Sequence, residues 1–170
     1  MKLTRFISAS AVQKRVAELG LKINRDFKNK NLVVICVLNG AFMFCSDLIK
    51  HLKVDVEIDF IKLSSYRNAK TSSGKINVLK KLNCEIYRKN VLIVEDIVDT
   101  GLTIKYLINL VKKHSPSSVK VATLLHKSDV SNIDFKLDYV GFDIENKFVV
   151  GYGLDYAQKF RNLKGIYLMN

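Results

Sequence analysis

Residues 91–103 read Val-Leu-Ile-Val-Glu-Asp-Ile-Val-Asp-Thr-Gly-Leu-Thr, and this stretch decides the fold. Four apolar residues, Val91–Val94, predict a short buried strand, and the adjacent carboxylates of Glu95 and Asp96 follow at its end. The small-residue turn Asp99–Thr103 then opens a helix. Such a turn offers backbone N–H groups and hydroxyls to a phosphate. The acid pair suits a sugar diol or a cation, so the stretch suggests a seat for a ribose 5-phosphate.

The rest of the chain alternates predicted strands and helices. Ser10 is expected to cap a first helix, whose apolar residues from Val12 to Phe27 recur at helical spacing. The other expected helices are 41–52 and 100–113, and the expected strands are 32–38, 54–60, 76–79, 91–94, 119–125, 139–142 and 148–150, the last two closing the sheet. Several strands are apolar throughout, which is typical of a parallel sheet with helices on both faces. The pattern predicts an α/β fold in a single domain over residues 1–170.

Polar residues follow three of these strands. Asn39-Gly40, Glu95-Asp96 and His126-Lys127 each come directly after an apolar run. Because ligands of parallel sheets bind at the carboxyl ends of the strands, these pairs are expected to share one active site. The polar segment 64–75 has no apolar anchor after Tyr66 and is expected to be a flexible lid over that site. A plain hairpin tip is the alternative.

The chain is strongly basic. It carries 28 Lys and Arg against 16 Asp and Glu, a net charge of +12. The basic residues are mostly Lys and are scattered, whereas base readout in nucleic acids favours Arg forks and aromatic platforms. The charge therefore favours small anionic ligands over nucleic acid.

Composition also bears on the cellular compartment. No run of eighteen apolar residues predicts a membrane span, and the N-terminus does not resemble a signal peptide. The three cysteines are odd in number and lack CxxC spacing. A cytoplasmic location, with no membrane partner, is expected.

Val91–Thr103 resembles the phosphoribosyl-pyrophosphate signature of type I phosphoribosyltransferases. Its Val-Glu-Asp-Ile-Val-Asp-Thr-Gly core is similar to the hypoxanthine-guanine branch in particular. The resemblance covers nearly the whole chain, through segments 38–42, 64–66, 124–127, 140–142, 147–156 and 160–161. One departure is Asn39, where the family often has a basic residue. The resemblance implies a phosphoribosyltransferase fold with a small hood and a flexible lid loop.

The resemblance also implies a reaction. The family transfers a phosphoribosyl group from phosphoribosyl pyrophosphate to a 6-oxopurine base, here hypoxanthine and also guanine, giving IMP or GMP and pyrophosphate. Mg²⁺ as cofactor and a homodimer or homotetramer are implied with it. Two alternatives stay open: a relative that prefers xanthine or guanine, and a nucleotide-sensing regulator that binds nucleic acid.

The same resemblance assigns site residues. Those expected to bind substrate are Asn39, Gly40, Ser65, Tyr66, Glu95, Asp96, Thr100, Gly101, Leu102, Thr103, Lys127, Lys147, Phe148, Val149, Asp155 and Arg161. Asp99 is the expected general base, which takes the proton from N7 of the purine. Glu95 and Asp96 would bind the ribose hydroxyls, and with Asp155 they would hold Mg²⁺.

The remaining roles concern the base and the pyrophosphate. Lys127 would donate to O6 of the purine, Phe148 would stack on it, and the Val149 backbone would contact its Watson–Crick edge. Arg161 would neutralise the departing pyrophosphate. Each residue also has an ordinary structural interpretation: Asp99 as a helix cap, Lys127 as a solvated lysine and Phe148 as part of the core.

Overall fold

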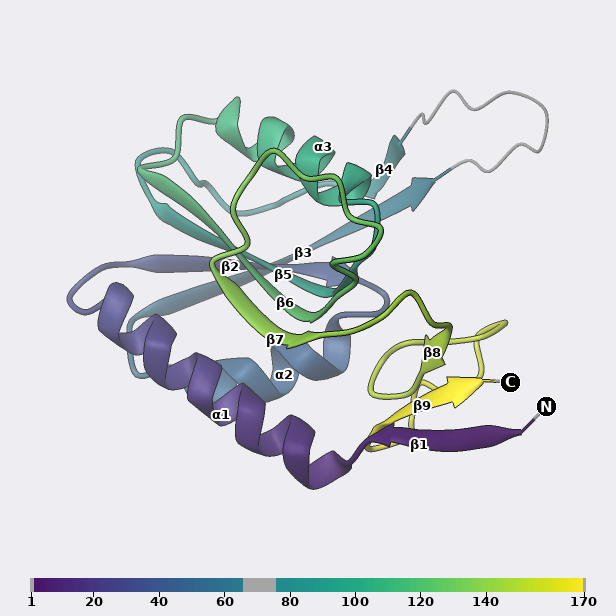
Figure 1. Ribbon diagram of the computed structural model, residues 1–170. Helices are drawn as coiled ribbons and strands as arrows, with labels where there is room; N and C mark the ends of the chain where they lie inside the picture. Colours follow the sequence, from purple (N-terminus) through teal and green to yellow (C-terminus); the bar gives the residue numbers. More distant parts are fainter. Residues whose placement is uncertain (1, 66–75, 170) are drawn as a thin grey trace.

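The computed structural model describes residues 2–65 and 76–169 (Figure 1). The strands are β1 Leu3–Ile7, β2 Leu32–Leu38, β3 Val56–Ser65, β4 Ile76–Lys80, β5 Asn90–Val98, β6 Ser118–His126, β7 Tyr139–Asp143, β8 Val149–Val150 and β9 Ile166–Met169. The helices are α1 Ala9–Asp26, α2 Phe42–Lys50 and α3 Leu102–Lys112.

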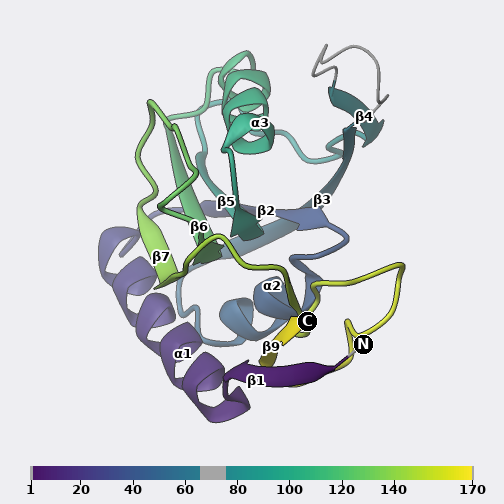
Figure 2. The same cartoon turned by 45° about the vertical axis from the view of Figure 1, so that its right-hand side comes forward.

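A six-stranded sheet in the order β4-β3-β2-β5-β6-β7 forms the centre of the molecule. Its strands pair in parallel, apart from the antiparallel pair of β3 and β4. Helices α1 and α2 cover one face and α3 covers the other (Figures 1 and 2). The predicted α/β class with a mainly parallel central sheet is confirmed.

Strand β2 shows why the sheet needs helices on both sides. Leu32, Val34 and Cys36 pack into the core beneath α1 and α2. Val33, Ile35 and Val37 alternate with them and pack into the second core, beneath α3. Side chains of successive strand residues point to opposite faces, so a run that is apolar at every position must be covered twice.

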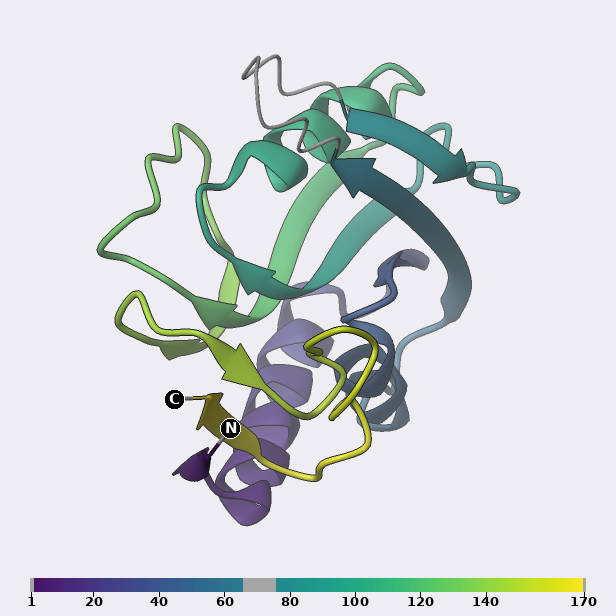
Figure 3. The ribbon, with the colours of Figure 1, turned by 90° about the vertical axis from the view of Figure 1, so that its right-hand side faces the viewer.

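A second, three-stranded antiparallel sheet has the order β1-β9-β8 and joins the two ends of the chain (Figures 1 and 3). The expectation that residues 148–150 close the main sheet is wrong, because β8 pairs with β9 instead. Buried Val149 and Ile166 belong to the same core as α1 and α2. The small sheet forms the hood beside the carboxyl edge of the main sheet.

Three expected boundaries shift, and the first is that the strand expected at 54–60 runs from Val56 to Ser65 as β3. Ser8, not Ser10, caps α1: the Ser8 backbone is extended and its Oγ accepts from the Ala11 N–H at 3.2 Å. Ser10 already lies inside the first turn. Strand β5 continues through the acid pair to Val98, because the ladder to β6 extends past it.

No helix in the described ranges is long and apolar enough to cross a membrane.

Candidate active site

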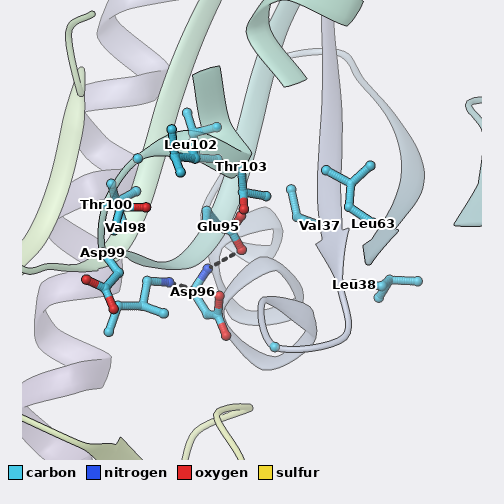
Figure 4. Close-up of a pocket in the computed structure, with 14 residues that line it drawn as sticks. Val37, Leu38, Leu63, Glu95, Asp96, Val98, Asp99, Thr100, Leu102 and Thr103 are labelled. Atoms are coloured by element: carbon cyan, nitrogen blue, oxygen red, sulfur yellow. Dashed lines mark hydrogen bonds between the residues drawn. The ribbon is translucent and has the colours of Figure 1, made fainter. Parts of the chain in front are cut away.

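Strands β2, β5 and β6 end at the same edge of the sheet, as expected for parallel neighbours. A cavity of about 250 Å³ lies there (Figure 4). It is lined by Val37, Leu38, Gly40, Leu63, Glu95, Asp96, Ile97, Val98, Asp99, Thr100, Gly101, Leu102, Thr103 and Ile104. One cavity thus brings together the acid pair, the turn after it and the turn after β2.

Glu95 and Asp96 form the floor of this cavity. Glu95 is only 6% exposed, and its Oε1 accepts from the Asp96 N–H at 3.2 Å. Asp96 is half-buried and accepts from the Ile97 N–H at 2.9 Å. Burial, with the neighbouring Asp96 charge second, raises the pKa of Glu95 well above its ordinary value. Burial also raises the pKa of Asp96. Two adjacent buried acids of this kind are stabilised by a diol or a cation.

The turn after β2 requires glycine. A Cβ on Gly40 would lie 1.6 Å from Asp96 Oδ2, so only a residue without a side chain fits there. The preceding Leu38–Asn39 peptide bond is cis, and the Asn39 side chain is exposed. The main chain of this turn therefore lies directly against the acid pair.

The helix start after β5 is left without a side-chain cap. Gly101 is the N-cap of α3 and has φ +84°, and within the described part of the chain no side-chain hydrogen bond caps this helix start. The ordinary interpretation of Asp99 as a helix cap therefore does not apply, and its side chain is exposed, as is that of Thr100. A free helix start facing a cavity favours an anion.

Lys127 connects the end of β6 to this turn. It is 8% exposed, and its Nζ lies 3.4 Å from Asp99 Oδ2 and 3.1 Å from Asn146 Oδ1. The structure thus brings the expected general base and the expected purine donor into direct contact. Asn146 was not singled out in the sequence, because an amide on a loop carries no signal of its own.

The hood residues lie around the mouth of the site. Phe148 is 52% exposed and packs edge-on against Tyr156, with ring centroids 6.0 Å apart. The side chain of Val149 is buried. Lys147 turns away to Glu145, at 2.7 Å, and to the ring of Phe6. Phe148 does not line the cavity, but its exposed aromatic ring is available for stacking.

Asp155 and Arg161 form an ion pair with each other at 2.8 Å. Arg161 also donates to the Gly153 carbonyl at 2.7 Å. A Cβ on Gly153 would lie 2.0 Å from the Gly40 carbonyl oxygen, so this part of the hood packs on the turn after β2. Arg161 lies close enough to Asp96 to lower its pKa slightly, against the larger effect of burial.

The acids do not form a complete metal site by themselves. Within residues 2–65 and 76–169 no group of three or more His, Cys, Asp or Glu side chains is placed to hold a metal ion. Asp155 is committed to Arg161 and not to the acid pair. The residues fit an Mg²⁺ ion that takes most of its ligands from substrate and water, as Mg²⁺ commonly does.

The structure does not describe the side chains of two expected site residues, Ser65 and Tyr66. Tyr66, with the rest of the proposed lid, falls outside the described residues, and Ser65 is described only by its backbone in β3.

Residues 6–157 match the family described as the phosphoribosyl transferase domain. The hypoxanthine-guanine phosphoribosyltransferase of Bacillus subtilis (strain 168) is 43% identical over 157 residues, covering 92% of this chain and 87% of that protein. A crystal structure of such an enzyme from Bacillus anthracis superimposes with a TM-score of 0.95 at 45% identity, covering 99% of this chain and 100% of that one.

The bifunctional protein TilS/HprT of Listeria monocytogenes serotype 4b is also 43% identical over 92% of this chain. This chain spans only 24% of the length of that relative.

Proposed function

The chain belongs to the phosphoribosyltransferase family, and from that premise we propose that it transfers the 5-phosphoribosyl group of phosphoribosyl pyrophosphate to hypoxanthine and guanine. The products are IMP or GMP and pyrophosphate. The named relatives in Bacillus carry this activity in their names and cover most of this chain.

One observation carries the proposal: a buried acid pair and an uncapped helix start line the same cavity. Glu95 and Asp96 suit the two ribose hydroxyls, because carboxylates make stronger hydrogen bonds to hydroxyls than neutral acceptors do. The turn Asp99–Thr103 suits the 5′-phosphate, through its N–H groups and the hydroxyls of Thr100 and Thr103. Both ends of one sugar phosphate are thereby recognised.

Lys127 positions the purine base, and Asp99 accepts a proton from it. The Lys127 ammonium donates to O6 of a 6-oxopurine, whereas the 6-amino group of adenine presents hydrogens instead. Asp99 takes the N7 proton as the bond from N9 to the sugar forms. The Lys127–Asp99 contact of 3.4 Å supports this pairing of roles, since O6 and N7 lie next to each other on one edge of the base.

Mg²⁺ supplies charge neutralisation for the departing pyrophosphate when it is bound. Glu95 and Asp96 would hold it together with substrate oxygens, and Asp155 would be able to join them if its ion pair with Arg161 opened. Arg161 would then be available to the pyrophosphate as a bidentate donor.

The other assignments complete the site. Phe148 stacks on the base, and the Val149 main chain contacts its edge. Asn39, Gly40, Ser65 and Tyr66 surround the pyrophosphate, Leu102 lies in the phosphate turn, and Lys147 is an outer contact. Residues 64–75 act as the lid that excludes water from the reactive sugar.

We further propose one domain over residues 1–170, a cytoplasmic enzyme and a homodimer or homotetramer. Core residues shared between the two sheets support the single domain. The free thiols of Cys36, Cys45 and Cys84 support a reducing compartment.

A direct assay tests the function. Purified protein is incubated with Mg²⁺, phosphoribosyl pyrophosphate and, in parallel, hypoxanthine, guanine, xanthine or adenine, and nucleotide is measured by absorbance. We expect IMP and GMP and at most traces of AMP. Formation of no nucleotide, or of XMP alone, would overturn the proposal.

A further inference from the structure

His126 ends β6 immediately before Lys127, and both of its ring nitrogens are hydrogen-bonded. Nδ1 lies 2.7 Å from Asp143 Oδ1, and Nε2 lies 2.7 Å from Ser131 Oγ. The side chain is only 15% exposed. An ionised carboxylate can only accept, so Nδ1 carries a proton, and in the neutral ring Nε2 accepts from the Ser131 hydroxyl. The ring thus joins three segments that are not adjacent in sequence.

The Ser131 branch fixes the main chain of Lys127. The Lys127 carbonyl accepts from the N–H groups of Ser131 at 3.1 Å and Val130 at 3.3 Å, and the Lys127 N–H donates to the Val98 carbonyl at 2.9 Å. These bonds close a turn over residues 127–131. The His126 ring holds the far end of that turn through Ser131.

The Asp143 branch leads to the ammonium group of Lys127. Asp143 ends β7 directly opposite His126 in the parallel ladder, and the Ile144 N–H donates to the His126 carbonyl at 2.8 Å. Three residues after Asp143, Asn146 accepts from Lys127 Nζ at 3.1 Å. The loop that holds the ammonium therefore begins at a residue that His126 fixes.

We propose that His126, with Ser131 and Asp143, positions Lys127 and thereby sets the selectivity of the site for 6-oxopurines. This rests on the proposed function, since it assigns Lys127 to O6 of the base. His126 acts through Lys127 and is a positioning residue.

The order of hydrogen bonds from Ser131 to His126 to Asp143 is also that of a hydrolytic triad. Two observations argue against that reading. The Ser131 N–H, which would help to form an oxyanion hole, is bonded to the Lys127 carbonyl. The Asp143 side chain is 64% exposed, whereas a triad aspartate is buried. The cluster is built to hold a turn.

His126→Phe tests the proposal, because it keeps a ring of similar size and removes both hydrogen bonds. We expect the KM for hypoxanthine to rise about tenfold, in line with the cost of displacing a positioned group by a fraction of an ångström. The KM for phosphoribosyl pyrophosphate should change by no more than about twofold. The ratio of kcat/KM for hypoxanthine to that for adenine should fall. Ser131→Ala, which removes a single hydroxyl, should show the same pattern more weakly.

A double-mutant cycle separates positioning from general loss of stability. Adding Ser131→Ala to His126→Phe should cost little more, because both changes remove the same hydrogen bond. Additive increases in the KM for hypoxanthine would overturn the proposal. So would equal increases in the KM of both substrates, or labelling of Ser131 by a fluorophosphonate.

The exposed His114 provides the matched control. His114→Phe makes the same chemical change outside the cluster and should leave both KM values unaltered. Thermal unfolding of each variant reports on the fold independently. Wild-type protein that forms no IMP would refute the proposed function, whereas active wild type with an unaltered His126→Phe variant would refute only the positioning role.

Discussion

The placement of Glu95 destabilises the molecule when no substrate is bound. Its carboxyl group is buried beside that of Asp96, so burial and then the neighbouring charge raise its pKa. An acid with a raised pKa in the folded state contributes stability that is present at low pH. That stability is lost as the pH rises from its ordinary pKa through the raised value. At pH 8 the free protein should therefore be less stable than it would be with a neutral side chain in place of Glu95.

Glu95→Gln should stabilise the free protein and abolish its activity. The neutral amide has the same shape and removes the buried repulsion, so we expect a gain of about 1–2 kcal/mol in the free energy of unfolding at pH 8. The gain should shrink towards pH 4.5, where Glu95 holds its proton. Urea unfolding at both pH values measures it. Glu145→Gln, at an exposed glutamate, should give no gain, and a Glu95→Gln variant less stable than wild type at pH 8 would contradict the argument.

Asp99→Asn should lower kcat far more than it weakens the binding of phosphoribosyl pyrophosphate. The amide keeps the size of the side chain but cannot take a proton, and general bases typically contribute about 10²- to 10⁴-fold. Steady-state kinetics with hypoxanthine, together with direct binding of the sugar donor, separate the two effects. Asp55→Asn, at an exposed aspartate that does not line the cavity, is the control. Unchanged turnover in Asp99→Asn would remove the base assignment.

At the scale of single residues, the sequence predicted which side chains belong to the site better than it predicted the contacts between them. Glu95, Asp96 and Gly40 could be placed at one edge, because each follows an apolar run in a parallel sheet. The contact between Lys127 and Asn146 could not be predicted, because it joins two loops whose separation depends on the whole sheet. For the same reason the ion pair between Asp155 and Arg161 could not be predicted from the sequence.

At the scale of elements, a buried aspartate stabilises the junction between β3 and β4. Asp59 is 5% exposed. One of its oxygens accepts from the Phe60 N–H and Lys80 Nζ, and the other from the N–H groups of Asn83 and Cys84. Burial alone would raise the pKa of Asp59, but these hydrogen bonds lower it far below its ordinary value. The segment that leads from β4 to β5 is thereby held against β3.

Asp59→Asn should destabilise the protein by about 2–3 kcal/mol at pH 7. Whichever oxygen becomes NH₂, that group faces donors and leaves them unpaired. Because the pKa of Asp59 is lowered in the folded state, its contribution is present above the ordinary pKa and lost as the pH falls through the lowered value. The difference in unfolding free energy between wild type and variant should therefore narrow in acid. Asp55→Asn, at an exposed position, is the control, and an equal difference at pH 7 and pH 3 would disprove the account.

The central strands of the main sheet could be predicted because their apolar runs are continuous. The expected strand 32–38 matches β2, and both cores need every one of its side chains. The end of β5 was missed, because two carboxylates in sequence indicate exposure, whereas the ladder to β6 carries them into the interior. A hood was expected from the resemblance, but its strands β1 and β9 were missed because they are short and lie at opposite ends of the chain.

For the whole molecule, a net charge of +12 accompanies a site that is lined by acidic side chains. If the proposed function holds, the excess of lysine attracts the polyanionic donor from a distance. The proposed contacts of Glu95 and Asp96 with the diol and with Mg²⁺ form only after the donor has arrived. Long-range attraction and local recognition are therefore separable, because salt screens the first far more than the second.

This separation predicts different salt dependences for the two substrates. Between ionic strengths of about 0.01 and 0.15 M the Debye length falls from roughly 30 to 8 Å. Over that range kcat/KM for phosphoribosyl pyrophosphate should fall at least about threefold, because its approach is steered by charge. The KM for uncharged hypoxanthine should hardly change. Initial rates at constant free Mg²⁺ measure both quantities. An equal fall in kcat/KM for the two substrates would show that salt acts on the fold or the chemistry and not on the approach of the donor.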